Sequence, residues 1–203
     1  MQHFFVKSEN IIDGKIRVEG ADVNHMKNVL RMKIGEEVSV SDGVSDTEYR
    51  CEIEEFLEDE IILKIRFVKE DGVELPARVV LFQGLPKNDK MELIVQKAVE
   101  LGAAEIVPVA MDRCVVKLDD KKAIKKVERW QGIAEAAAKQ SKRGIMPRVT
   151  NVMTMKQAVS YAKELESVAI PYELAEGIHF RPNHNNKSKT PCKNKKTKTY
   201  FGN

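Results

Sequence analysis

Short runs of alternating apolar and polar residues dominate residues 1–70, and this pattern indicates β-strands. Val38 and Val40 alternate with polar residues before Asp42-Gly43, which is a strong turn signal. The run YRCEIEEF follows as another strand. The next run, EIILKIRFV, alternates around Lys64 and Arg66, with its apolar face predicted to comprise Ile61, Leu63, Ile65 and Phe67. Several strands in so few residues predict a small barrel.

A polar stretch with Gly and Pro, KEDGVELP at residues 69–76, marks the predicted boundary between residues 1–70 and residues 74–178. Beyond it, the hydrophobic pattern changes to buried-type strands separated by amphipathic helices. The run RVVLFQG predicts a strand, Asn88 a helix N-cap and Gly102 the end of that helix. Its predicted apolar positions are Met91, Ile94, Val95, Ala98 and Leu101.

The rest of this region repeats the alternation of strand and helix. AEIVPVAM predicts a strand, a long helix is expected over residues 120–141, a weaker helix over 154–164, and a buried strand over 167–173. The apolar face of the long helix is expected to contain Val127, Trp130, Ala134 and Ala137. Such alternation predicts an α/β domain with a parallel sheet, whose ligands bind at the carboxyl ends of the strands.

Residues 179–203 have a different composition, with seven Lys or Arg and no Asp or Glu. They follow neither a strand nor a helix period, so we expect a disordered basic tail. The net charge of the whole chain is +3, yet residues 1–178 alone carry −4. Any affinity of residues 1–178 for nucleic acid must therefore come from local basic patches.

The spacing of the cysteines and the length of the apolar runs indicate in which compartment the protein resides. Cys51, Cys114 and Cys192 are widely spaced and form no CxxC pair or cluster with His, so we expect isolated thiols and no metal site. The apolar runs are too short to span a bilayer, and the N-terminus has no secretory signal pattern. We expect a cytoplasmic protein without membrane association.

Two basic stretches are the clearest candidates for a function. HMKNVLRMKIGEEV contains Lys27, Arg31 and Lys33, and KQSKRGIMPRV, at the end of the long helix, contains further cations: Lys139, Lys142, Arg143 and Arg148. Lys and Arg in such patches contact RNA phosphates. Cations at a helix C-terminus also complement the macrodipole, so the second stretch alone leaves both interpretations open.

Four blocks, in order along residues 1–178, resemble the ribosomal RNA small subunit methyltransferase E family: HMKNVLRMKIGEEVSVSDG, QGLPKNDKMELIVQKAVELGAAEIVPVAMDRCVV, VERWQGIAEAAAKQSKRGIMPRV and IPYELAEG. The resemblance implies an α/β fold class with a PUA-like N-terminal β-barrel followed by a SPOUT-type α/β domain that ends in a knot. It also implies a homodimer that uses S-adenosylmethionine to methylate N3 of a specific uridine in 16S rRNA of the small ribosomal subunit.

The same resemblance implies roles for particular residues. The RNA-binding set takes His25, Arg31, Gln140 and Arg143 from the family blocks, and Lys33 from the first basic stretch. Tyr172 and Glu173, in the PYE block, are expected to border the cofactor. The resemblance assigns no catalytic residue.

Residues 179–203 do not match the Gly-rich loop and knot segment that the family resemblance implies at this place. We therefore expect the C-terminal knot segment to be missing, through truncation or a frameshift after residue 178, and methylation to be impaired. The alternative hypotheses are a non-catalytic RNA-binding protein and a non-functional frameshift fragment.

Overall fold

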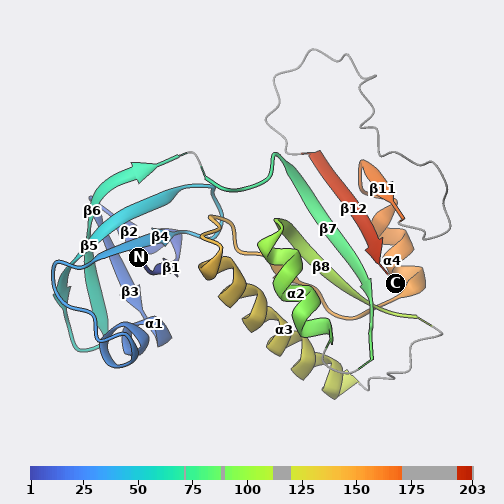
Figure 1. Ribbon diagram of the computed structural model, residues 1–203, viewed down its shortest axis with the longest axis horizontal. Helices are drawn as coiled ribbons and strands as arrows, with labels where there is room; N and C mark the ends of the chain where they lie inside the picture. The colour runs from blue at the N-terminus through green and yellow to red at the C-terminus, as the bar shows by residue number, and fades with distance from the viewer. Residues whose placement is uncertain (71, 88–89, 112–119, 171–195, 203) are drawn as a thin grey trace, which may run out of the picture.

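Two sheets organise the molecule, and a single extended connection joins them (Figure 1). The computed structural model describes residues 1–70, 72–87, 90–111, 120–170 and 196–202. The N-terminal sheet lies on one side with the N-terminus, and the second sheet lies on the other side together with the three longest described helices, α2, α3 and α4 (Figure 1).

The first sheet has six strands in the order β1-β4-β5-β6-β3-β2. Their bounds are His3–Phe5 for β1, Ile11–Ile12 for β2, Lys15–Glu19 for β3, Glu37–Ser41 for β4, Glu48–Phe56 for β5 and Glu60–Lys69 for β6. All pairs are antiparallel except β1 with β4. A short 3-10 helix, η1 (Ser8–Asn10), helix α1 (Ala21–Asn24) and a π-helical turn, η2 (His25–Val29), complete this part. The curved sheet matches the predicted small barrel.

Alternation along β6 predicts its core-facing side correctly only in the first half of the strand. Ile61 and Leu63 are fully buried in the core of the first sheet, and Ile65 packs against it. Phe67 is instead 59% exposed. Strand β3 pairs with β6 only as far as Lys64, so the second half of β6 extends past the enclosed core.

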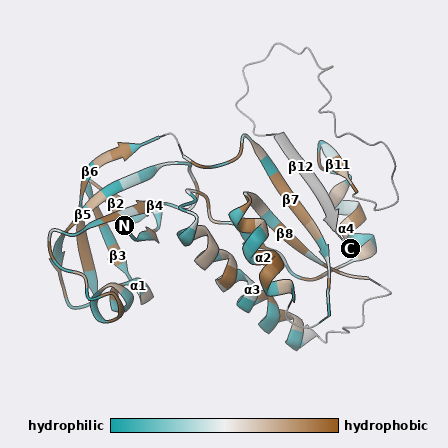
Figure 2. Cartoon of the chain, viewed as in Figure 1, coloured by the Kyte–Doolittle hydropathy of each residue, from teal (hydrophilic) through white to brown (hydrophobic). Residues whose placement is uncertain are grey.

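The second sheet is parallel, in the order β10-β8-β7-β12-β11, with β9 pairing β8. Its strands are Ala77–Gly84 (β7), Ala103–Ala110 (β8), Arg148–Val149 (β9), Met153–Thr154 (β10), Ser167–Ala169 (β11) and Lys196–Gly202 (β12). Helices α2 (Lys90–Glu100) and α3 (Asp120–Gln140) cover one face, and α4 (Met155–Ala162) covers the other. β7 and β8 are apolar along most of their length, as burial on both faces requires (Figure 2).

Helices α2, α3 and α4 form where the sequence places them, but the predicted apolar face of α2 is wrong at one position. Leu101 follows the end of the helix and is 79% exposed, whereas Val99 is buried. On α3, Trp130, Ala134 and Ala137 are buried against α2, and Val127 packs beside them. Helix α2 ends at Glu100, and Gly102, two residues later, adopts φ +95°. A Cβ there would meet Leu75 Cδ1 at 2.6 Å, so both the backbone conformation and the close approach favour glycine.

Two expectations for the C-terminal part need correction. The strand predicted as buried over residues 167–173 is the short edge strand β11, in which Val168 is 46% exposed. The prediction of an unstructured tail also fails at Lys196–Gly202, because these residues form β12 between β7 and β11. Backbone pairing with two parallel neighbours compensates there for the absent sequence periodicity. The remaining tail residues, 179–195, lie outside the described residues, as does the predicted N-cap Asn88.

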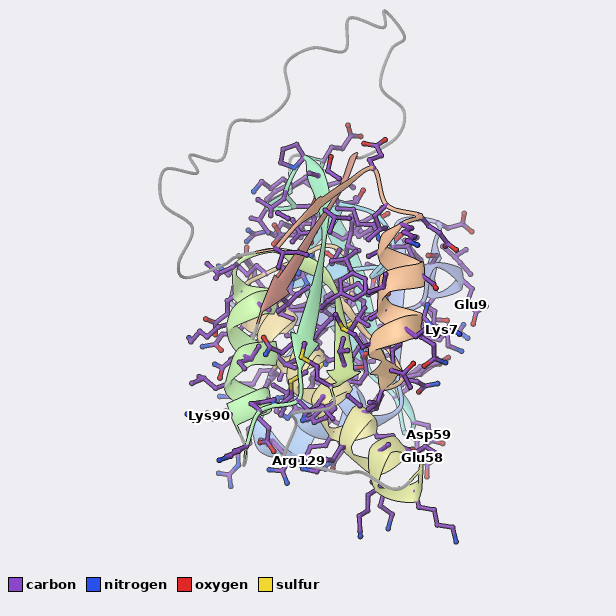
Figure 3. The ribbon with its side chains drawn as sticks, turned by 90° about the vertical axis from the view of Figure 1, so that its right-hand side faces the viewer. Lys7, Glu9, Glu58, Asp59, Lys90 and Arg129 are labelled. Atoms are coloured by element: carbon purple, nitrogen blue, oxygen red, sulfur yellow. The ribbon has the colours of Figure 1, made fainter. Side chains whose placement is uncertain are left out.

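An ion pair joins the exposed margins of α2 and α3. Arg129 Nε lies 2.8 Å from Glu92 Oε1. Figure 3 shows Arg129 of α3 and Lys90 of α2 projecting at the same end of the molecule. The pair is largely exposed on the arginine side, so the apolar contact beneath it supplies most of the stabilisation.

Cys51 is expected to resist alkylation in the native protein. Its side chain is buried in the core of the first sheet, and burial raises the pKa of the thiol to about 12. Because the thiolate is the reactive form, iodoacetamide at mildly alkaline pH should label Cys51 only after denaturant is added. Peptide mapping by mass spectrometry measures this, and rapid labelling of Cys51 in native buffer would contradict the expectation.

Among the described helices, none is both long enough and apolar enough to cross a membrane.

Candidate functional site

The first sheet packs directly on the C-terminal end of α3, which points toward β1 (Figure 1). Phe5 of β1 packs against the core formed by α2 and α3. In addition, the Met146 amide donates a 2.8 Å hydrogen bond to the Gly43 carbonyl. The two parts of the chain therefore share an interface built from apolar packing and backbone hydrogen bonds.

Arg143 lies inside this junction, at the end of α3. Its guanidinium makes a two-pronged ion pair with Glu74, at 3.1 Å from Nε and 2.7 Å from Nη2. Nη1 donates to the carbonyls of Val99 and Ala103. The side chains of Arg143 and Glu74 are only 3% and 5% exposed. The arginine expected in an exposed RNA-binding patch thus anchors the inter-sheet connection to α2 and β8, because these buried acceptors occupy its donors.

A cleft of about 560 Å³ opens where the first sheet meets α3. One wall comes from β1, α1 and η2, and the other from the last two turns of α3. Its lining combines amides, two imidazoles, one ion pair and a few apolar side chains: Gln2, His3, Phe4, Ala21, Asp22, Asn24, His25, Val29, Ala136, Lys139 and Gln140.

An ion pair joins the two walls of the cleft. Lys139 Nζ lies 2.9 Å and 3.0 Å from the two carboxylate oxygens of Asp22. The same ammonium group sits 5.8 Å from the centre of the Phe4 ring. Both side chains of the pair are partly shielded from water, and opposite charges cancel, so this stretch of wall carries no net charge.

His3 is the most deeply buried polar residue of the cleft, at 5% exposure. Its Nδ1 is 2.8 Å from Ser39 Oγ, and the Arg143 backbone also interacts with the ring. Burial lowers the pKa of the imidazole from 6.5 to about 4. The Glu48 carboxylate and the Arg143 backbone oppose that shift, and the positive charge of Lys139 adds to it. His3 is therefore neutral at physiological pH.

Of the five residues expected to bind RNA, the structure brings two together. His25 and Gln140 come from distant blocks of the sequence, are both exposed, and line the same cleft. Arg31 and Lys33 are exposed on the connection after η2, outside the cleft lining, and make no ion pair among the described residues. Ser141, beside Gln140, donates its hydroxyl to the Ala137 carbonyl at 2.7 Å.

The carboxyl edge of the second sheet is the other place where a ligand is expected. The parallel strands β7, β8 and β10 end there side by side, at Gly84, Ala110 and Thr154. Leu85 continues from β7 with its amide bonded to the Val109 carbonyl at 3.0 Å, and exposed Lys87 follows. Tyr172 and Glu173, expected to border the cofactor, lie outside the described residues.

The sequence did not predict three residues that lie where the first sheet meets α3: Asp22, Glu74 and His3. Glu74 sits in a polar connection with Gly and Pro, which reads as a solvated turn. Its partner Arg143 is 69 residues away, so no local pattern links them. His3 offers a weak signal, since it lies between a polar N-terminus and two phenylalanines in a strand-like run.

Comparison with known families agrees with this division of the chain. A model described as "RNA methyltransferase PUA domain" matches residues 18–66, and one described as "RNA methyltransferase domain" matches residues 73–198. The first match covers the first sheet from the end of β3 to β6, and the second covers nearly all of the second sheet. The expected fold class, a PUA-like N-terminal domain followed by a SPOUT-type α/β domain, is confirmed.

Among solved structures, a hypothetical protein is 31% identical with a TM-score of 0.82, over 98% of this chain and 79% of that one. A putative methyltransferase from Legionella pneumophila, in complex with the bound cofactor SAM, is 25% identical with a TM-score of 0.74, over 98% and 78%.

Two curated relatives carry the same name. The chain is 36% identical over 176 residues to ribosomal RNA small subunit methyltransferase E of Bacillus subtilis, covering 85% of this chain and 68% of the relative. It is 32% identical to the protein of that name from Synechocystis, covering 84% and 52%. The chain thus spans between about half and about two thirds of these relatives. It belongs to the ribosomal RNA small subunit methyltransferase E family.

Proposed function

We propose that this protein uses S-adenosylmethionine to methylate N3 of a specific uridine in 16S rRNA. The observation that carries the proposal is the pairing of a PUA-like domain with an RNA methyltransferase domain, in a chain 36% identical to a named member of the family. The inter-domain cleft lined by His25 and Gln140 supports it, since both residues fall in blocks expected to contact RNA.

The described part of the carboxyl edge of the second sheet has the type of structure that binds such a cofactor. Parallel strand ends of open α/β sheets commonly bind nucleotide-like ligands. The backbone beyond Gly84 and the partly buried side chain of Met111 lie at the ends of β7 and β8, and we expect them to contact the adenosine part. S-adenosylmethionine supplies an electrophilic methyl group. Tyr172 and Glu173 are proposed to border it.

Uridine N3 is a weak acid, so the base must lose its N3 proton before or during methyl transfer. A cation beside the uracil ring would stabilise the resulting anion electrostatically. The exposed cations Arg31 and Lys33 are proposed to position the RNA through its phosphates, because neither is engaged by a carboxylate among the described residues. A homodimer, as the family resemblance implies, is part of the proposal and is measurable by light scattering.

The test is methyl transfer to small ribosomal subunits from a strain that lacks the corresponding modification. With radiolabelled S-adenosylmethionine, we expect label in 16S rRNA at a reduced rate, because residues 179–203 do not match the segment that the family resemblance implies there. The label should coincide with a reverse-transcription stop at one uridine, because a methyl group on N3 blocks base pairing. For the same reason as the reduced rate, calorimetry with the cofactor alone should show weakened binding. Absence of both label and cofactor binding would refute the enzymatic proposal. RNA binding without either would support a non-catalytic RNA-binding protein instead.

A further inference from the structure

We propose that the cleft between the first sheet and α3 binds one unpaired nucleobase of the RNA, apart from the carboxyl edge where methyl transfer is expected. This inference rests on the proposed function in one respect, namely that the substrate is RNA. At about 560 Å³ the cleft lies within the size range of sites for small ligands. One wall belongs to the N-terminal domain and the other to helix α3 of the second domain, so a base held there would touch both domains.

Amide side chains give the cleft the hydrogen-bonding character that a base edge requires. Gln2 and Asn24 come from the first sheet's side and Gln140 from α3, and all three are exposed. Each amide offers two donors and an acceptor, which can pair with the mixed donor and acceptor edges of an unstacked base. Asn24 Oδ1 accepts from Asn28 Nδ2 at 2.6 Å, which orients the Asn24 amide group.

His25 supplies an exposed aromatic ring on the same wall. Its ring centre lies 6.5 Å from that of Phe4, in an edge-on arrangement that holds the imidazole against the sheet. Bases splayed out of single-stranded RNA stack on aromatic side chains, including histidine. A ring beside three amides is the combination that such recognition uses.

The charge distribution favours a base over a phosphate. Among the described residues that line the cleft, Lys139 is the only lysine or arginine, and Asp22 neutralises it at 2.9 Å. His3 is neutral, as its burial requires. A phosphate placed here would face a carboxylate without an unpaired cation, whereas an uncharged base would not suffer this repulsion. Arg31 and Lys33, which make no ion pair within the described part of the chain, lie outside the lining.

The test compares His25→Ala and Gln140→Ala with Asn151→Ala, a matched exposed amide outside the cleft. Affinity of the full chain for a single-stranded RNA fragment of 16S rRNA is measured over a range of salt concentrations. We expect each cleft substitution to weaken binding on the order of 10-fold without changing the salt dependence. Lys33→Ala, a phosphate-type change, should instead reduce the salt slope by about one unit.

Equal affinities for the cleft variants and Asn151→Ala would overturn the proposal. A reduced salt slope for the cleft variants would also overturn it, since it indicates that the cleft contacts a phosphate. If the cleft variants bind normally while the unaltered protein still methylates RNA, the cleft proposal alone fails. If the unaltered protein binds no RNA, both proposals fail. Photocrosslinking with 4-thiouridine RNA adds a direct readout, and crosslinked peptides should come from residues 21–29 or 136–140. Crosslinks confined to other regions would contradict the assignment.

Discussion

Replacing Arg143 with alanine is expected to destabilise the protein by about 3–5 kcal/mol, because it leaves the buried Glu74 carboxylate without its partner. The carbonyls of Val99 and Ala103 also lose their donor. Chemical denaturation of the variant measures the loss. Since the guanidinium anchors the connection between the sheets, the effect should appear in stability even when no RNA is present.

Arg148→Ala is the matched control for this prediction. Arg148 is exposed on β9 and makes no ion pair among the described residues, so its loss should change stability by less than about 0.5 kcal/mol. The double variant Arg143→Ala with Glu74→Ala should recover part of the loss, because it removes the uncompensated charge. If Arg143→Ala is as stable as Arg148→Ala, the buried ion pair does not have the role given to it.

Acidification is expected to destabilise the protein through His3. Burial holds the pKa of the folded-state imidazole near 4, whereas the unfolded value is 6.5. Between these values the unfolded chain binds a proton that the folded chain does not, so stability falls as pH decreases from about 6.5 to about 4. The depressed pKa corresponds to a loss of about 3 kcal/mol across that window.

The measurement is the free energy of unfolding at pH 7 and at pH 4.5, for the unaltered protein and for His3→Gln. Other acidic groups titrate in the same range, so the prediction concerns the difference between the two proteins. Glutamine can retain a hydrogen bond to Ser39 and takes up no proton. The variant should therefore lose less stability on acidification. Parallel pH profiles for the two proteins would contradict the prediction.

Local periodicity predicted the elements whose structure depends on local contacts. The stripe around Trp130 and Ala134 located α3 and its buried face, and Gly102 located the end of α2. The same reasoning failed at Phe67, because alternation along a strand contains no information on where its neighbour ends. It failed at β12 as well, since that strand is stabilised by pairing with β7 and β11.

The candidate site was less accessible to sequence reasoning for a physical reason. Whether a cation is free or buried depends on its partner, and Glu74 is far from Arg143 along the chain. The meeting of His25 with Gln140 depends on how the first sheet packs on α3. The family resemblance gave His25, Gln140 and Arg143 the same expected role in RNA binding, but it did not indicate that the first two line one cleft or that the Arg143 side chain is buried.

Phe5 has a consequence for how the molecule folds. Its strand, β1, completes the first sheet by pairing with β4, while its ring packs into the core of α2 and α3. The change in sequence pattern at residues 69–76 therefore does not mean that the two halves of the chain fold independently. Neither half can reach its full stability alone, and cutting the chain at that connection would separate a ring from the core that shields it. We infer that the two halves unfold as one thermodynamic unit.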